Sequence, residues 1–290
     1  MVSTRHRTTI ALLTLIALFS TVASAQASLD LRFGEMESHI GQALHLRVVD
    51  TTSRQEIARL TVPEISESSF EMEISGLSLG SSIRIDVYVD VNDNGSYDAP
   101  PIDHAWRVEL AEVRIDGSLT FVHSTAFTDV GWPPAIDGVL DEAEYASWMF
   151  DEQTGMDVYT SALDDLLYVG LRAPGTGWLS IGFDPVLRMQ GANIIIASIE
   201  DETLTIEDHY GNSPVSHRRD AVDHVVQAAG TEENDVSILE FAFPLDSGDD
   251  QDKALIAGDE VTIILAFHRS SDQFTVRHSE RSTTSIRLGG

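Results

Sequence analysis

The chain has 290 residues, contains no cysteine and carries a formal net charge of −29 at pH 7. The lack of cysteine excludes disulfides, thiolate metal ligands and thioether-linked prosthetic groups. A surface with so many carboxylates repels nucleic acid and anionic lipid, so neither is expected as a partner. Lys253 is the only lysine. This composition is typical of a protein from a saline environment, where salt screens the self-repulsion, or simply of an acidic secreted protein.

Residues 1–25 have the pattern of a signal peptide. Arg5 and Arg7 form a positive start, Ile10–Phe19 is apolar, and Ala23-Ser24-Ala25 is a small-residue cleavage site. The apolar stretch is shorter than the roughly 20 residues that span a bilayer, although an uncleaved N-terminal anchor is an alternative. We expect a mature chain that begins at Gln26, is secreted to an extracellular or periplasmic location and has no integral membrane segment. Loss of the two arginines would change the net charge from −29 to −31.

The first half predicts a small all-β domain over residues 26–127. Ile83, Ile85, Val87 and Val89 alternate with polar residues, which is the period of a half-buried strand. Short strands at this spacing are typical of a sandwich. The predicted strands are Ala43–Asp50, Ile57–Val62, Ser69–Ile74, Ile83–Val91, Ala105–Val113 and Leu119–His123.

A loop in this half has the spacing of a calcium site. Counting Asp90 as position one, Asn92, Asn94, the Ser96 carbonyl and Asp98 fall at positions three, five, seven and nine. Gly95 falls at position six, where a calcium loop turns sharply, whereas the usual glutamate at position twelve is replaced by Pro101. The alternative is a metal-free hairpin with a type I′ turn at Asn94-Gly95. The strand and loop also resemble those of transthyretin-like, or prealbumin-like, secreted sandwiches.

Residues 128–134 predict a linker, because Trp132-Pro133-Pro134 interrupts regular structure. A second all-β domain is expected over residues 135–290, with one helical turn near Asp141–Ala146. Its predicted strands are Asp157–Ala162, Leu166–Arg172, Trp178–Phe183, Asn193–Ser198, Thr203–Asp208, His224–Ala229, Val236–Pro244, Glu260–His268, Phe274–His278 and Thr284–Leu288.

Four ordered motifs of this second domain resemble the DOMON family of haem-binding and sugar-binding β-sandwiches. Gly177–Phe183 resembles the family's Gly-Trp-x-x-x-Gly-Phe strand. Met189–Ile194 resembles its Met-x-Gly-Ala-Asp strand entry, with Asn193 in place of the acid. Asp208–Tyr210 matches an Asp-x-Tyr, and His278 with the following residues matches the closing histidine strand.

The resemblance implies a cofactor site, because haem-binding members use a methionine and a histidine at the positions of Met189 and His278. A thioether and an imidazole on opposite sides of one iron suit outer-sphere electron transfer, and without cysteine the haem would be a non-covalent haem b. Ile181, Phe183, Ile195 and Leu265 are the expected porphyrin contacts. Taken singly, Met189 would more often be a core residue and His278 a solvated one.

The remaining histidines of this half, His209, His217, His224 and His268, lack metal-like spacing and are expected to be surface or loop residues. No hydrolytic, zinc-protease or phosphate-binding motif is recognisable, so a binding or electron-carrier role is favoured over an enzyme. The leading hypothesis is an exported cytochrome-like module with an unknown redox partner. The alternatives are a secreted module that binds a glycan ligand without haem, and a structural adhesion protein.

Overall fold

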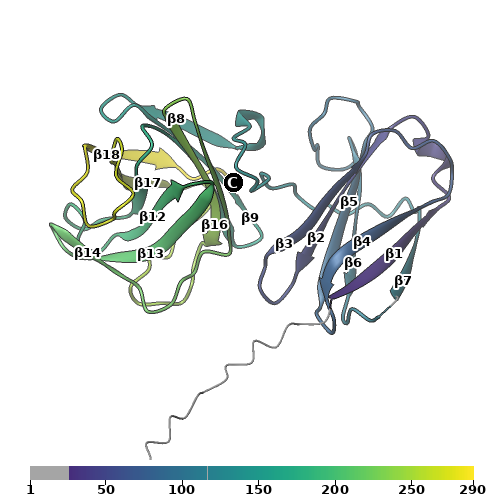
Figure 1. Ribbon diagram of the computed structural model, residues 1–290. Helices are drawn as coiled ribbons and strands as arrows, with labels where there is room; N and C mark the ends of the chain where they lie inside the picture. Colours follow the sequence, from purple (N-terminus) through teal and green to yellow (C-terminus); the bar gives the residue numbers. More distant parts are fainter. Residues whose placement is uncertain (1–25, 116) are drawn as a thin grey trace, which may run out of the picture.

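The computed structural model describes residues 26–115 and 117–290, and it consists almost entirely of β-strands (Figure 1). Two groups of strands, purple to blue and teal to yellow in Figure 1, form separate sandwiches. Within the described residues, no strand of one group pairs with a strand of the other. The all-β prediction with two sandwiches is confirmed. The expected signal peptide lies outside the described residues, and the described residues contain no helix long and apolar enough to cross a membrane.

The first sandwich packs a three-stranded sheet, in the order β4-β1-β7, against a four-stranded sheet, in the order β3-β2-β5-β6. Its elements are β1 (Gln26–Gly34), the 3-10 turn η1 (Glu37–His39), β2 (Ala43–Asp50), β3 (Glu56–Val62), β4 (Phe70–Ser78), β5 (Ile83–Asp90), β6 (His104–Leu110) and β7 (Gly117–Val122). The central strand β1 runs antiparallel to β4 and parallel to β7. Its alternate residues Leu29, Leu31 and Phe33 enter the core, where each is at most 2% exposed.

The second sandwich packs a five-stranded sheet, in the order β15-β16-β10-β9-β8, against a six-stranded sheet, in the order β14-β13-β12-β11-β17-β18. The strands of the five-stranded sheet are β8 (Ser147–Asp151), β9 (Met156–Leu163), β10 (Leu166–Pro174), β15 (Gln227–Glu233) and β16 (Val236–Pro244). Those of the six-stranded sheet are β11 (Leu179–Phe183), β12 (Asn193–Glu200), β13 (Thr203–Ser213), β14 (Ser216–Arg219), β17 (Glu260–Phe267) and β18 (Glu280–Arg287). The predicted helical turn is the 3-10 turn η2 (Glu142–Glu144).

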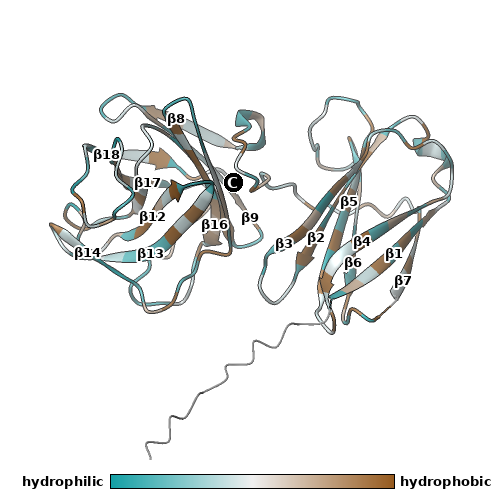
Figure 2. Cartoon of the chain, viewed as in Figure 1, coloured by the Kyte–Doolittle hydropathy of each residue, from teal (hydrophilic) through white to brown (hydrophobic). Residues whose placement is uncertain are grey.

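Hydrophobic and hydrophilic residues alternate along strands such as β13, as Figure 2 shows, so that one face of each sheet supplies the core. β5 departs from the predicted half-buried pattern. Ile83, Ile85 and Val87 enter the core as expected, but Asp86 and Tyr88 on the opposite face are also buried. The outer face of this strand is therefore covered by another part of the chain.

The cover is the linker, residues 128–134, which lies against the four-stranded sheet. The Trp132 ring meets the Tyr88 ring edge-on with a centroid distance of 4.6 Å. The guanidinium of Arg59 lies over the Trp132 ring, 5.3 Å from its centroid, and donates to the Pro133 carbonyl at 3.0 Å. Arg107 donates to the Val130 carbonyl at 2.9 Å. The linker is thus held by an aromatic contact and by backbone hydrogen bonds to arginine.

An ionic network joins the two sandwiches next to this linker. Asp86 is fully buried and accepts hydrogen bonds from Arg47, Arg84 and Arg107 at 2.6–3.1 Å. Arg47 and Arg84 also pair with Asp164, which lies in the turn between β9 and β10 of the second sandwich. Burial acts to raise the pKa of Asp164, but the charges and hydrogen bonds of Arg84 and Arg47 together lower it below its ordinary value. An ion pair at the surface contributes little to stability. Here, however, Arg47 and Arg84 bind Asp164 together with the buried Asp86, so the network restrains the junction between the two domains.

A strap formed by residues 135–145 crosses the outer side of the five-stranded sheet. Glu240 of β16 is fully buried beneath it and accepts hydrogen bonds from the Gly138 N–H at 2.9 Å and the Tyr145 hydroxyl at 2.8 Å. Gly170 of β10 makes room for the strap, since a Cβ there would lie 2.3 Å from a methyl carbon of Leu140. One carboxyl group therefore anchors the strap to the sheet.

Candidate functional site

The start of β11 is locked to the loop that carries His278. A Cβ on Gly177 would lie 2.5 Å from the His268 carbonyl oxygen and the Ser271 nitrogen, so only glycine fits. The Trp178 N–H donates to the Ser271 carbonyl at 2.9 Å, and its carbonyl accepts from the His268 N–H at 2.8 Å. The Trp178 indole is buried, and its Nε1 has no hydrogen-bond partner within the described part of the chain. The Gly-Trp motif thus fixes residues 268–279 relative to the six-stranded sheet.

Met189 and His278 both lie in loops. Met189 is half-buried in the connection between β11 and β12, and its carbonyl accepts from the Ala192 N–H at 3.1 Å. That connection packs on Gly211, where a Cβ would lie 1.5 Å from the Met189 carbonyl oxygen. His278 is half-buried in the connection that leads into β18. The predicted strand Phe274–His278 is wrong, because this segment is a turn and an extended loop.

The register places these two loops at opposite ends of the six-stranded sheet. β18 begins beside the Leu179 end of β11, so His278 lies beyond that end. β12 begins beside the Phe183 end, so Met189 lies beyond the other. The four steps along β11 between these ends span about 13 Å at about 3.3 Å per residue. The structure therefore does not bring the two residues into contact but sets them at the two borders of one sheet.

The structure places the expected porphyrin contacts in the interior of the sandwich. Ile181, Phe183, Ile195 and Leu265 all belong to the core of the sandwich and are at most 1% exposed. Because side chains alternate along a strand, their neighbours form the outer face of the six-stranded sheet. This outer face consists of Ser180, Gly182, Ile194, Ile196 and Ile264 between the two loops.

The centre of the outer face consists of apolar side chains around Gly182, which has no side chain. Ile194 and Ile196 are 4% and 2% exposed although they point away from the core, so other parts of the chain cover them. A Cβ on Gly182 would lie 2.7 Å from Ile264 and 3.0 Å from Ile194, so these two side chains close over the glycine. The apolar strip is therefore packed against other parts of the chain rather than open to a ligand.

His278 opens into a cavity of about 430 Å³ at the surface. Its other lining residues are polar: Gln153, Arg277, Ser279, Glu280 and Arg281. Burial lowers the pKa of His278, and the positive charges of Arg281 and Arg277 lower it further. The lowered pKa favours the neutral imidazole, which is the form that binds a metal, and the arginines offer positive charge for an anionic group.

The sequence of this part of the chain matches a known family. Residues 151–268 match the DOMON domain. The second sandwich is a DOMON domain. The match includes Met189 and ends before His278.

Two solved structures are similar to this chain. The cytochrome b domain of pyranose dehydrogenase from Coprinopsis cinerea is 12% identical, with a TM-score of 0.42, over 55% of this chain and 87% of that one. The cytochrome domain of Myriococcum thermophilum cellobiose dehydrogenase is 11% identical, with a TM-score of 0.34, over 50% of this chain and 89% of that one. No curated protein sequence matches the chain.

The DOMON domain also contains an acidic cluster that the sequence analysis missed. Asp208, His224 and Asp252 bring ligand atoms within 4.8 Å of one another. His224 Nδ1 lies 2.9 Å from an Asp252 oxygen, and the backbone N–H of His224 donates to the Asp208 carboxylate at 3.1 Å. Burial raises the pKa of Asp208 to about 7, helped by the charges of Asp252 and its neighbours. Two carboxylates and an imidazole are a donor set that could hold a divalent cation.

The predicted surface histidines of the DOMON domain divide into two groups. His209 of β13 is only 7% exposed and bonds His217 of β14 at 2.8 Å and Glu207 at 2.8 Å, so its assignment to the surface is wrong. His224 and His268 lie outside the strands, as expected. The acidic cluster was missed because Asp208, although part of the Asp-x-Tyr motif, cannot be distinguished in the sequence from the many other acidic residues.

The predicted calcium loop, residues 90–98, lies at the start of the connection between β5 and β6. The Asp90 carboxylate is buried and accepts from the Asn94 and Gly95 N–H groups at 3.2 and 2.8 Å. Asn92 and Asn94 both donate their amide groups to Asp98, at 2.8 and 2.7 Å. The type I′ hairpin alternative is wrong, because positive φ occurs at Asp93 and Gly95 and not at Asn94.

The oxygens of this loop thus already have partners within the protein. The Ser96 N–H donates to the Asn94 oxygen at 2.8 Å, and Asp103 accepts from the Val91 and Asp98 N–H groups at 2.9 and 2.8 Å. Among the described residues, the carboxylates of this loop do not form one of the clusters whose ligand atoms lie within 4.8 Å. Calcium binding by Asp90, Asn92, Asn94, Ser96 and Asp98 stays a prediction.

Proposed function

We propose that the protein is an exported electron-transfer module whose DOMON domain binds one haem b without a covalent link, with Met189 and His278 as the axial ligands. The observation that carries this proposal is that the loops of Met189 and His278 flank the two ends of one sheet of this domain. Bound haem would supply one-electron redox chemistry, with the thioether favouring the reduced iron.

Two properties of the chain support this assignment. The lowered pKa of His278 favours the neutral imidazole that binds a metal, and Arg277 and Arg281 beside it are suited to the propionate groups. The DOMON match supplies the fold, and a redox partner protein would be needed as the source or acceptor of electrons.

Absorption spectroscopy of the purified chain, titrated with hemin, tests the proposal. We expect one haem per chain and sharp reduced bands typical of six-coordinate iron. Met189→Leu and His278→Gln should each remove this spectrum. Met149→Leu and His45→Gln, which change the same residue types elsewhere, should retain it. A wild-type chain that takes up no haem, or variants with the unchanged spectrum, would overturn the assignment.

A second candidate function is glycan binding, which one observation favours. Trp148 and Phe150 are 60% and 50% exposed at alternate positions of the edge strand β8, so they present two aromatic faces on one side. The Trp148 Nε1 donates to Asp157 at 3.1 Å, which fixes the ring. Polysaccharide binding that is lost in Trp148→Ala, by a chain that takes up no haem, would replace the first proposal with this one.

A further inference from the structure

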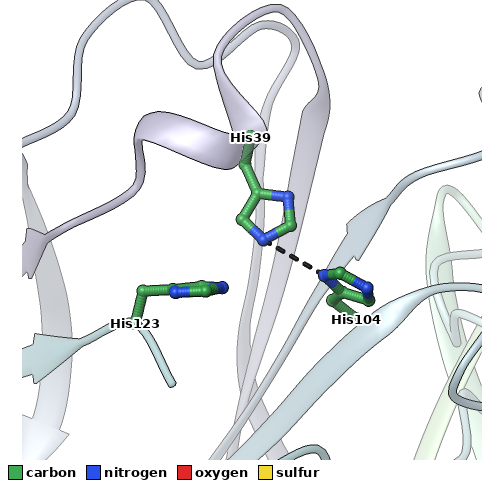
Figure 3. A group of neighbouring side chains, drawn as sticks. All are labelled: His39, His104 and His123. Carbon is green, nitrogen blue, oxygen red and sulfur yellow. Dashed lines mark hydrogen bonds between the residues drawn. The ribbon is translucent and has the colours of Figure 1, made fainter. Parts of the chain in front are cut away.

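Three histidines of the first sandwich converge at one end of its two sheets (Figure 3). His39 ends the 3-10 turn η1, His104 begins β6 of the four-stranded sheet, and His123 directly follows β7 of the three-stranded sheet. They are separated by 65 and 19 residues in the sequence, so no short motif reveals them. Figure 3 shows the three rings facing a common space from three different segments.

The nitrogen atoms are spaced as metal ligands. One nitrogen from each ring lies within 4.8 Å of the other two. His39 Nε2 and His104 Nδ1 are 3.3 Å apart. Two imidazole nitrogens on one tetrahedral ion, at about 2.0–2.1 Å each, lie about 3.3 Å from each other. His123 Nε2 is buried and has no hydrogen-bond partner among the described residues. A buried polar atom without a partner is costly in a folded protein, and a ligand would remove that cost.

A glutamine outside the cluster fixes the protonation of its most buried member. The Gln42 side chain donates its NH₂ group to the Val91 carbonyl at 3.4 Å, which directs its oxygen toward His39 Nδ1 at 2.7 Å. An amide oxygen only accepts, so Nδ1 carries the hydrogen and the lone pair of the neutral ring is at Nε2. Ligating histidines are typically oriented in this way by a hydrogen bond from the second ring nitrogen.

Aromatic side chains hold the other rings and keep the surroundings apolar. His104 stacks on Phe127 with a centroid distance of 4.0 Å, and Trp106 meets His123 edge-on at 5.5 Å.

We propose that His39, His104 and His123 bind one divalent transition-metal ion, zinc or copper, through three imidazole nitrogens, with a fourth coordination position open to solvent. An all-imidazole set favours these ions over calcium or magnesium, which require oxygen ligands. His104 and His123 are partly exposed, so the ion has an access route. Because the ligands come from η1, β6 and the end of β7, the ion links the two sheets of the first sandwich. This site is independent of the proposed haem site.

Metal titration of the tag-free chain from Gln26 to Gly290 tests the proposal, after bound metal has been removed with a chelator. Calorimetry with Zn²⁺ and with Cu²⁺ should give one tight site per chain, and the Cu²⁺ form should show nitrogen ligands by electron paramagnetic resonance. Zinc should also raise the melting temperature, because it binds the folded state. His123→Gln should weaken the affinity of this site at least 100-fold, and Gln42→Ala about 10- to 100-fold.

Two control variants make the result specific. His45→Gln changes a first-domain histidine outside the cluster, and Asp208→Asn disables the acidic cluster of the DOMON domain, so both should keep the tight site. If His123→Gln does not fold, as judged by its metal-free melting curve, His104→Gln replaces it. No tight binding of either ion, or equal affinity in wild type and His123→Gln, would overturn the proposal.

Discussion

Glu240, which anchors the strap of the DOMON domain, makes the stability of that domain depend on pH. Burial raises its pKa from 4.5 to about 7, against the lowering effect of its hydrogen bonds from Tyr145 and Gly138. A carboxyl with a raised pKa stabilises the folded state while it is protonated, and this stabilisation is lost as the pH rises through about 7. At about 1.36 kcal/mol per pH unit, the loss between pH 5 and pH 8 is on the order of 2–3 kcal/mol.

Glu240→Gln should remove this loss. The amide can accept from the Gly138 N–H and donate to the Tyr145 oxygen, so both hydrogen bonds survive without a charge. We expect the variant to equal the wild type near pH 5 and to exceed it at pH 8 by about 2–3 kcal/mol. That difference corresponds to about 4–12 °C in the melting temperature of a domain of this size.

Calorimetric melting of both chains from pH 5 to pH 9 measures the effect. Glu200→Gln, a change of an exposed glutamate at the end of β12, is the matched control and should follow the wild type at every pH. Glu240→Ala should be destabilised even at pH 5, by about 1–3 kcal/mol, because buried polar groups lose their partner. Parallel curves for the wild type and Glu240→Gln would refute the reasoning.

Three other predictions concern the domain junction, the motif glycine and the calcium loop. Asp164→Ala removes the shared partner of two arginines, so calorimetry should show the two domains melting further apart; a single unchanged transition would contradict this. Gly177→Ala places a methyl group against the backbone of the 268–279 loop and should lower DOMON stability by about 1–3 kcal/mol in denaturant titration, whereas Gly34→Ala, with no atom closer than 4.0 Å, should cost far less. Calcium at 100 times its Kd should stabilise the first sandwich by about 2.7 kcal/mol, and Asp90→Ala should abolish the increment. Identical melting curves with and without chelator would exclude this site.

The strands were largely predictable because alternation of apolar residues is a local signal. β2 and β16 begin and end where the pattern predicts. β1 was missed although Ala27, Leu29, Leu31 and Phe33 alternate, since it directly follows the predicted leader. Phe274–His278 was wrongly expected to be a strand, because its Val276 N–H bonds the Gln273 carbonyl at 2.9 Å within the same loop and not a neighbouring strand.

Sites were less predictable than strands because they depend on register and on contacts between remote segments. The motif residues Met189 and His278 could be named from the sequence, but which face lies between them could not, because a shift of one residue exchanges core and outer face. His39, His104 and His123 carry no local signature and meet only when the two sheets pack. The burial of Asp86 depended on where the linker docks, which composition does not encode.

The position of β1 has a consequence for biogenesis. This strand lies between β4 and β7. The ribosome therefore synthesises the central strand of the sheet first, and its neighbour β7 some ninety residues later. Until residue 122 has emerged, Leu29, Leu31 and Phe33 lack part of their cover. Pairing of segments so distant along the chain is slow, and the incomplete sandwich exposes an unpaired strand edge and apolar side chains. We therefore expect a nascent chain of this protein to need chaperone protection, or rapid completion, to avoid aggregation.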